Sequence, residues 1–495
     1  MNSVDDGREA RVAFASHVDA SRLRTIRQLP EPRSLPLLGA ALSINPSRFH
    51  QNLERWFVSI GEPYRVRMPG RQFAVFGDAA IIRSVLQQRP HLFRRAKVLS
   101  DIMGELGVEG VFAFEGEQWK RNRKLMMPPF VPTQLKRFFP KLQMIAERLR
   151  QRWLRLADEQ AVVDIQLEFE RFATDVTVLL AFGHDVNTID GHADTLQRDL
   201  RVLFPALNRR VTAAFPYWRY IKLPIDRVAE RARDNLIAAL MPIIAAARER
   251  LRSDSARRQA PESLLEAMIA AEMSDAEDLR LTEAELFGNV ITLLAAGEDT
   301  TAHTLSWMVH SLVMYEGAQE KLIHEVDNVL APALGLRSCE DTEQLKYLEG
   351  IAQECLRLKS VAPFLLLQPL EDVVIGDVLV PSSTTIVVLT RHAAMQADAF
   401  SEPARFMPER WMRDSDSAAT RCPVHQPKVS MAFGAGPRLC PGRNLALLEM
   451  HSAMSMLARN FRVTAACDPE AVQEKSSFTM MPEGLLVRLA RRKTS

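Results

Sequence analysis

One short stretch near the C-terminus reads Phe433-Gly434-Ala435-Gly436-Pro437-Arg438-Leu439-Cys440-Pro441-Gly442, and a run typical of a helix, residues 443–450, follows it. Three glycines and two prolines among ten residues exclude a regular helix or strand, so we expect a tight loop of fixed shape. Cys440 stands just before the expected helix start, where backbone N–H groups and the helix dipole stabilise negative charge on sulfur. A thiolate held in this way is either a metal ligand or a nucleophile.

The spacing of the residues around Cys440 helps to decide whether it is an inert buried residue, a metal ligand or a nucleophile. A lone cysteine is more often a small buried apolar residue without chemistry. Here the cysteine belongs to a set with fixed intervals: Phe433, Gly436, Arg438, Cys440 and Gly442. This set resembles the haem-binding loop of the cytochrome P-450 superfamily, the haem-thiolate monooxygenases. The alternative is a catalytic nucleophile paired with a distant histidine, but no local signature of a cysteine protease accompanies it.

The resemblance gives each residue of the loop a task. It implies that Cys440 is the metal ligand and supplies the fifth bond to the iron of haem b (iron protoporphyrin IX). The sulfur then donates electron density to the iron, which favours O–O cleavage. Phe433 then shields the sulfur with an apolar ring, and glycines such as Gly434 let backbone N–H groups approach it. Arg438 is expected to pair with a haem propionate through a charge-assisted hydrogen bond.

Length and composition are compatible with this resemblance. The resemblance implies a mainly α protein with a smaller β portion. Its single large haem domain would span residues 29–495, with an N-terminal extension over residues 1–28. The 495 residues are 47% hydrophobic and 25% charged, which is ordinary for a globular protein. The net charge of +2 gives no reason to expect a nucleic-acid partner.

Cysteine usage and hydropathy bear on the compartment. The five cysteines are an odd, scattered set, which argues against a disulfide framework and for a reducing, cytoplasmic setting: Cys339, Cys355, Cys422, Cys440 and Cys467. Residues 1–27 contain no apolar run, and no later segment offers about twenty uninterrupted apolar residues. We therefore expect a soluble protein without a transmembrane anchor, as in the bacterial type of the family.

The N-terminal third shows one clear hairpin signal. Residues 64–68 and 72–76 alternate in polarity around a turn at residues 69–71, which predicts two antiparallel strands. Residues 78–88 are expected to form a helix capped by its first residue. Residues 93–114 show weak periodicity and are predicted to be a long loop, which the resemblance would place over the substrate.

Trp119 and Arg123 lie one turn apart on a predicted helix and so share a face. Such a pair is usually a surface cation–π contact. The resemblance instead implies that both residues contact a haem propionate.

A long helix is predicted to follow Thr282, because Thr282 and Glu285 form a capping-box pattern and no strong stop occurs before Gly317. At 1.5 Å per residue the helix would measure roughly 50 Å, enough to cross a whole domain.

The middle of this helix carries Ala296, Gly297, Glu298, Asp299 and Thr300. A solvent-facing turn with ordinary charges is the alternative interpretation. The resemblance is to the oxygen-activation site of the family, in which Ala296 and Gly297 leave room over the iron. Thr300 would then donate a hydrogen bond to dioxygen or to a water, and Asp299 would help relay protons from solvent. Glu298 occupies the variable position of this motif and is given a supporting role.

A structural element of the family also has a counterpart here. Glu354 and Arg357 lie three residues apart on a predicted helix, and Arg410 follows in Phe406-Met407-Pro408-Glu409-Arg410. The resemblance implies a buried network of these three side chains that holds the haem-side core together.

Taken together, these residues predict a monooxygenase that inserts one oxygen atom from O2 into a mainly apolar small molecule. The chain ends 55 residues after Cys440, so electrons from NAD(P)H are expected to arrive through a separate ferredoxin or flavodoxin with its reductase. One alternative is a peroxide-using or isomerising haem-thiolate enzyme, which would not need the proton relay of Asp299 and Thr300. An alternative of another class is a non-catalytic haem-binding sensor.

Overall fold

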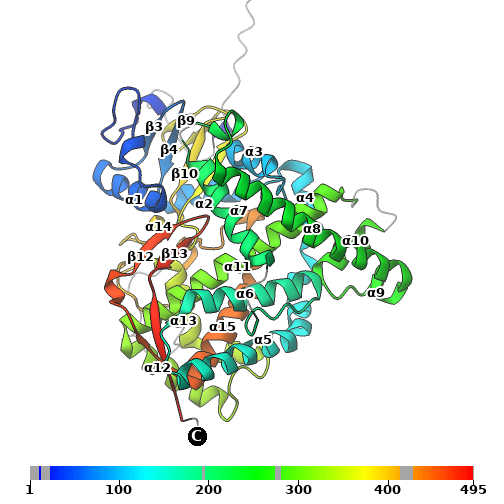
Figure 1. Ribbon diagram of the computed structural model, residues 1–495. Helices are drawn as coiled ribbons and strands as arrows, with labels where there is room; N and C mark the ends of the chain where they lie inside the picture. Colours follow the sequence, from blue (N-terminus) through cyan, green and yellow to red (C-terminus); the bar gives the residue numbers. More distant parts are fainter. Residues whose placement is uncertain are drawn as a thin grey trace, which may run out of the picture.

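Helices form most of the structure, a computed structural model that describes residues 11–12, 23–191, 195–213, 215–273, 280–412 and 427–493. Cys422 lies outside these residues. Figure 1 shows the longest helices gathered on one side of a smaller β portion, as predicted. The helices are α1 (Phe49–Ile60), α2 (Ala79–Gln87), α3 (Lys97–Glu105), α4 (Gly116–Met126), α5 (Pro132–Asp158), α6 (Ile165–Phe182), α7 (Thr195–Thr212), α8 (Pro224–Ser253), α9 (Ser255–Gln259), α10 (Leu264–Glu272), α11 (Glu283–Met314), α12 (Glu316–Leu330), α13 (Lys346–Leu358), α14 (Thr390–Ala393) and α15 (Arg443–Asn460).

Within the described residues the strands form four small sheets. The largest has the order β3-β4-β10-β7-β5, in which β4 and β10 are parallel and the other neighbours antiparallel. The others are β1-β8-β9-β2, β11-β14-β6 and β12-β13. The strands are β1 (Arg11–Val12), β2 (Arg24–Thr25), β3 (Tyr64–Met68), β4 (Arg71–Phe76), β5 (Phe93–Arg95), β6 (Val163–Asp164), β7 (Leu365–Pro369), β8 (Val373–Ile375), β9 (Val378–Val380), β10 (Thr385–Val388), β11 (Phe461–Ala465), β12 (Gln473–Ser476), β13 (Met480–Glu483) and β14 (Leu486–Arg491).

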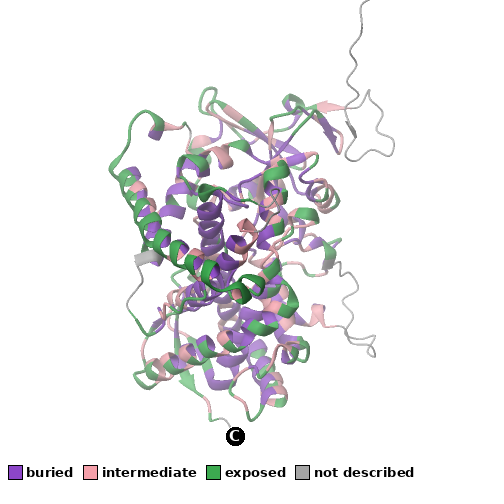
Figure 2. Cartoon of the chain, turned by 90° about the vertical axis from the view of Figure 1, so that its right-hand side faces the viewer, coloured by how far each residue is buried: buried purple, intermediate pink, exposed green. Residues whose placement is uncertain are grey.

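The long central helix, α11, begins as its sequence predicts. Thr282 Oγ1 accepts a hydrogen bond from Glu285 N (3.1 Å), and the Glu285 carboxylate accepts one from Thr282 N (2.8 Å), which completes the capping box. Most of the helix is buried, and Figure 2 shows that buried residues fill the middle of the molecule while exposed ones lie on the outer helices. A helix that is apolar on most of its faces is typical of the core of a large protein.

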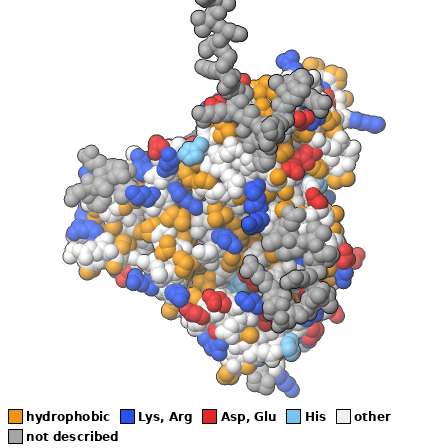
Figure 3. Space-filling view, turned by 180° about the vertical axis from the view of Figure 1, so that it is seen from behind, with side chains coloured by type: hydrophobic (Ala, Val, Ile, Leu, Met, Phe, Trp, Pro, Cys, Tyr) orange, Lys and Arg blue, Asp and Glu red, His pale blue; other side chains and the backbone are white. Residues whose placement is uncertain are grey.

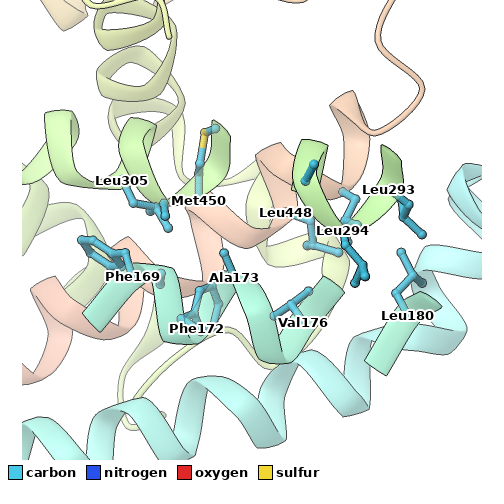
Figure 4. Packing of buried hydrophobic residues seen from close by; sticks show 14 of the residues in the cluster. Phe169, Phe172, Ala173, Val176, Leu180, Leu293, Leu294, Leu305, Leu448 and Met450 are labelled. Atoms are coloured by element: carbon cyan, nitrogen blue, oxygen red, sulfur yellow. The ribbon is translucent and has the colours of Figure 1, made fainter. Parts of the chain in front are cut away.

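Helix α6 provides the closest partner of α11. Figure 4 shows Phe169, Phe172, Ala173, Val176 and Leu180 of α6 beside Leu293, Leu294 and Leu305 of α11, with Leu448 and Met450 of α15 close by. All these side chains are buried, and each large one contributes about 1.5–3 kcal/mol through burial. This packing fixes the middle of α11 relative to the start of α15.

The predicted loop over residues 93–114 was wrong for residues 93–105, whereas residues 106–114 form no helix or strand. Phe93–Arg95 pairs with β7 as strand β5, and α3 follows at once. The strand is specified by a partner nearly 300 residues away in sequence, so no local pattern marks it. Helix α3 buries Leu99, Ile102 and Met103 at helical spacing, but it has only nine residues and no side-chain cap at its start, which made its periodicity easy to miss.

The predicted network of Glu354, Arg357 and Arg410 is confirmed. Arg357 donates to both carboxylate oxygens of Glu354 at 2.8 Å, and Arg410 Nε donates to Glu354 Oε1 at 2.9 Å. All three side chains have 0% exposure. The network joins α13 to the segment around Arg410, so one buried carboxylate holds together two parts of the chain that lie far apart in sequence.

The surface carries both signs of charge. In Figure 3 Lys and Arg side chains are spread over the visible face among apolar and acidic ones and do not gather into a single basic area. Within the described part of the chain, none of the helices combines the length and apolar character that crossing a bilayer requires.

Candidate active site

The cysteine loop takes its shape from glycine. Gly434 and Gly436 have φ values of +78° and +68°, in the left-handed region that other residues rarely adopt. A Cβ on Gly436 would lie 2.7 Å from Gln87 Cα in α2, so a side chain there is also excluded by contact. The Cys440 N–H donates a hydrogen bond to the carbonyl oxygen of Phe433 (2.9 Å). This bond closes the loop and holds the backbone of Cys440 beside that of Phe433.

Cys440 lies at the start of α15, whose N-cap is Gly442. Burial, which removes water from around the sulfur, raises the pKa of the thiol, while the N–H groups of Gly442 and Arg443 and the charges of Arg123 and Arg443 act in the opposite direction. These donors and charges favour the thiolate, and a bond from sulfur to a metal would replace the bound proton. Among the described residues there is no group of three or more His, Cys, Asp and Glu that could hold a metal ion. A single protein thiolate suits a metal whose other ligands come from a non-protein group such as a porphyrin.

Trp119 and Arg123 lie beside the cysteine loop, on α4. Arg123 Nη2 donates to the carbonyl of Leu439 (2.6 Å), directly before the cysteine. The guanidinium of Arg438 stacks over the Trp119 ring at 4.2 Å from its centroid. The two predicted propionate contacts and Arg438 thus belong to one contiguous group.

Arg438 is also part of a buried arginine cluster, which consists of Arg89, Arg95 and Arg438 around one carboxylate, Glu115. Arg438 donates to Glu115 and to the carbonyl of Phe114 (2.7 Å). Burial and neighbouring arginines lower the pKa of Arg438 to about 10 and hold the pKa of Arg95 well below its usual value. Three guanidinium groups against one carboxylate leave an excess of positive charge.

Some donors of this cluster have no partner among the described residues. Arg89 Nε, Arg89 Nη2 and Arg438 Nε are buried without a hydrogen bond. Buried donors and uncompensated buried charge are costly, so the cluster suits an anionic group. Haem carries two propionates, and these match both the excess charge and the unpaired donors. The residues present therefore fit the group that Cys440 would ligate.

Arg89 and Arg95 are site residues that the sequence did not reveal. Arg89 follows the helix predicted over residues 78–88, and Arg95 lies within the predicted loop over residues 93–114, where an arginine is normally solvated. Arg95 ends the three-residue strand Phe93–Arg95, and its burial depends on the pairing of that strand with β7.

The middle of α11 presents one uncovered face. Ala296 is exposed, although Ala295 and Glu298 beside it are buried. Thr300, one turn further on, is partly exposed, and its Oγ1 donates to the carbonyl of Ala296 (2.6 Å). Ala296 and Thr300 therefore share the face that protein does not cover.

Gly297 is turned toward α6. A Cβ at this position would lie 2.5 Å from Thr177 Oγ1, closer than real Cβ contacts allow. The close approach of α11 to α6 therefore explains why residue 297 has no side chain, and its part in making room for haem remains a prediction.

Glu298 is buried, and Asp299 beside it is partly exposed. Gln197 Nε2 of α7 donates to Glu298 Oε1 (3.1 Å). Burial and the neighbouring Asp299 raise the pKa of Glu298 to about 8, so this carboxyl holds a proton at neutral pH. Burial also raises the pKa of Asp299, while the charges of His303 and Arg201 oppose the rise. A carboxyl whose pKa is raised toward neutrality is suited to exchanging protons.

A further carboxylate connects this region with the surface. Glu170 of α6 forms an ion pair with Arg201, whose side chain is partly exposed, and lies 3.9 Å from His303 Nε2. His303 Nδ1 in turn lies 2.7 Å from Thr479 Oγ1. Glu170 and His303 were not anticipated from the sequence, because the two helices that carry them meet only in the folded protein.

The protonated Glu298 gives a prediction for stability. Its pKa is about 8 in the folded protein against a usual value of 4.5, so the folded state binds the proton more tightly than the unfolded state does. The stability from this group is fully present below pH 4.5 and is lost as pH rises toward 8. Glu298→Gln keeps the shape of the side chain but removes the carboxyl group that titrates. The free energy of unfolding, measured by urea at several pH values, should therefore fall less steeply with pH in this variant than in the wild type.

A control for this prediction lies on the same helix. Glu283 is largely exposed, and Glu283→Gln should keep the wild-type slope. Parallel curves for Glu298→Gln and the wild type would show that Glu298 is already ionised at neutral pH.

Comparison with known proteins agrees with the geometry. Residues 29–489 match the family model of Cytochrome P450. The chain is 26% identical to "Cytochrome P450 97B2, chloroplastic" of Glycine max over 93% of its own length and 86% of that protein. It is 29% identical to the human "25-hydroxyvitamin D-1 alpha hydroxylase, mitochondrial" over 76% and 74%, and 26% identical to human "Cytochrome P450 3A5" over 88% and 85%. The chain belongs to the cytochrome P450 family of haem-thiolate monooxygenases.

Proposed function

We propose that this protein inserts one oxygen atom from O2 into a mainly apolar organic substrate, by hydroxylation or epoxidation, and that the other oxygen atom leaves as water. The observation that carries the proposal is the loop at Cys440. Its sulfur lies at a helix start, among N–H groups and positive charges, beside an arginine cluster with unpaired donors. We propose that one haem domain spans residues 29–495.

Residues of this chain would hold haem b at two places. Cys440 would bind its iron, with Phe433 and Gly434 shaping the loop around the sulfur. The propionates would be held by Arg438, Trp119 and Arg123 together with the newly identified Arg89 and Arg95. When bound, the haem supplies the activation of dioxygen.

The protons that the reaction consumes would pass along α11. Asp299 lies within electrostatic reach of His303, Glu170 and Arg201, and Arg201 is partly exposed, so protons can enter from that side. Thr300 holds a hydroxyl proton on the uncovered face of the helix beside Ala296. Rotation of this hydroxyl away from the Ala296 carbonyl would present the proton to the reacting oxygen, and Glu298 would keep α7 attached to α11.

Aromatic side chains support an apolar substrate. The ring of Phe478 lies 5.8 Å from that of Phe112 and 5.4 Å from that of Phe204. These rings come from three separate segments of the chain. Such a wall would bind hydrocarbon surface and exclude water from the reaction.

The electrons would come from NAD(P)H through a separate ferredoxin or flavodoxin with its reductase. A cytoplasmic location suits the free thiols, because Cys339, Cys355, Cys440 and Cys467 form no disulfide with one another.

Thr300→Ala tests the proposed reaction. Without the hydroxyl, proton delivery should fail while electrons still arrive, so product formed per NAD(P)H oxidised is expected to fall about tenfold. The haem content should be unchanged. The measurement compares product, NAD(P)H consumption and peroxide release in a reconstituted reductase system, with Thr301→Val as control because Thr301 is buried next to it. Undiminished, fully coupled product formation in Thr300→Ala would contradict the proposed role.

A further inference from the structure

The tip of the β12–β13 hairpin lies between the aromatic wall and the long helix α11. The tip is the turn over residues 477–479, which follows β12 and precedes β13. Phe478 in this turn belongs to the wall with Phe112 and Phe204. The next residue, Thr479, is buried, and its side chain contacts α11 instead. Two consecutive residues of one turn therefore contact two different parts of the site.

His303 of α11 is the residue that Thr479 contacts. Thr479 Oγ1 lies 2.7 Å from His303 Nδ1, which is a hydrogen-bond distance, and both side chains are buried. The other ring nitrogen, Nε2, faces α6, where it lies 3.9 Å from Glu170 Oε1 and 3.5 Å from Gln166 Nε2. The contact with Thr479 therefore holds the His303 ring in the orientation in which it faces Glu170.

His303 belongs to the charged groups that surround Asp299. Asp299 stands one turn before His303 on α11, so the two side chains share a face of the helix. Burial raises the pKa of Asp299, the charge of His303 opposes this rise, and the charge of Glu170 reinforces it. Glu170 also pairs with Arg201 of α7, which is partly exposed. The polar contacts thus run from the surface at Arg201 through Glu170 to His303, and they end at the hairpin tip.

We propose that the hairpin tip couples occupancy of the aromatic wall to proton delivery, with Thr479 and His303 as positioning residues. A molecule packed against Phe478 steadies the tip, and the tip holds His303 in the orientation that sets the electrostatic surroundings of Asp299. Proton delivery is therefore efficient only when the wall is filled, which limits the waste of electrons in an empty site. This inference deepens the proposed monooxygenase function and rests on it.

Thr479→Val tests the coupling, because it removes the hydroxyl and keeps the size of the side chain. The probe is whichever of naphthalene, limonene and dodecane changes the absorbance of the ferric haem most in the wild type. Product formed per NAD(P)H oxidised should fall about fivefold in Thr479→Val, the factor expected for the loss of one hydrogen bond. Thr479→Ser restores the hydroxyl and should recover most of the coupling. Fully coupled product formation in Thr479→Val would overturn the proposal.

Hydrogen peroxide separates a loss of proton delivery from general damage to the site. Peroxide brings the oxygen together with the two protons and two electrons that O2 needs, so product formation from it bypasses the route along α11. With peroxide in place of O2 and NAD(P)H, Thr479→Val should therefore form product at the wild-type rate. An equal loss under both conditions would show that the tip only shapes the site, and it would overturn the coupling.

A readout that is independent of turnover follows the His303 ring itself. The histidines are labelled with 15N, the haem-loaded protein is studied in its ferrous carbonyl form, and the His303 signals are assigned by their loss in His303→Gln. Addition of the probe should shift these signals in the wild type but not in Thr479→Val. Ser477→Ala removes a hydroxyl from the same turn and should behave as the wild type does. Equal responses of the wild type and Thr479→Val, or no response in either, would overturn the proposal.

These outcomes can be separated from those of the proposed reaction. Coupled product formation that Thr479→Val leaves unchanged would support the monooxygenase and overturn the role of the tip. A response of His303 to the probe that requires Thr479 but is accompanied by no product would support the link between the wall and α11 and contradict the reaction. No change of absorbance with any of the three compounds would contradict the apolar wall and overturn the proposal.

Discussion

Replacing Cys440 by serine is expected to abolish monooxygenase activity, with a loss of at least about a thousandfold. The serine hydroxyl does not ionise in the physiological range, so the N–H groups of Gly442 and Arg443 and the charge of Arg123 would no longer stabilise an anionic ligand. The arginine cluster would still attract the propionates. We therefore expect a reduced haem content with altered absorption rather than an unfolded protein. Haem per chain and product formation are measured on the same preparation.

A matched control is Cys467→Ser. Cys467 is partly exposed, and its sulfur lies 3.4 Å from the N–H of Leu486, far along the chain from the loop. This variant should keep the haem, its absorption and the activity. Wild-type absorption and activity in Cys440→Ser would show that another residue ligates the iron.

Glu354→Gln is expected to destabilise the folded protein by about 3–5 kcal/mol. The substitution removes the negative charge of Glu354 between Arg357 and Arg410, and all three side chains have no exposure to solvent. Both buried guanidinium groups would then lose the carboxylate of Glu354 as an ion-pair partner. Glu354 also accepts hydrogen bonds from Met407 N (3.0 Å) and Trp411 Nε1 (2.8 Å), so the segment around Arg410 would be loosened at several points. The free energy of unfolding in urea, on haem-loaded protein, measures the effect.

Glu402→Gln provides the comparison. Glu402 and Arg405 form an ion pair in which both side chains are about 60% exposed, and such pairs contribute between zero and about 1 kcal/mol. A loss in Glu354→Gln no larger than that in Glu402→Gln would mean that the buried network does not stabilise the fold.

Features with a local cause could be predicted from the sequence. The capping box at Thr282, the hairpin over residues 64–76 and the glycine-shaped loop before α15 each depend on neighbours within a few residues, and all three form as expected. The Glu354 network was reached through the resemblance, because nothing in the spacing of Glu354 and Arg357 alone distinguishes a buried pair from a solvated one.

Features that depend on tertiary contacts could not be predicted in this way. Arg89 and Arg95 become a cationic cluster with Arg438 only because β5 pairs with β7 and α2 packs on the cysteine loop. The carboxylate of Glu170 meets His303 only where α6 lies on α11. Gly297 suggested room for a cofactor, whereas its close contact is with Thr177. In each case the sequence shows the residue but not its partner.

The most direct test of the haem-thiolate site is the absorption spectrum of the purified protein after reduction and exposure to carbon monoxide. Bonding of the iron to Cys440 predicts the strongly red-shifted main band that distinguishes thiolate-ligated haem. A colourless protein, or a carbonyl spectrum like that of a histidine-ligated globin, would contradict the assignment of Cys440 as the iron ligand.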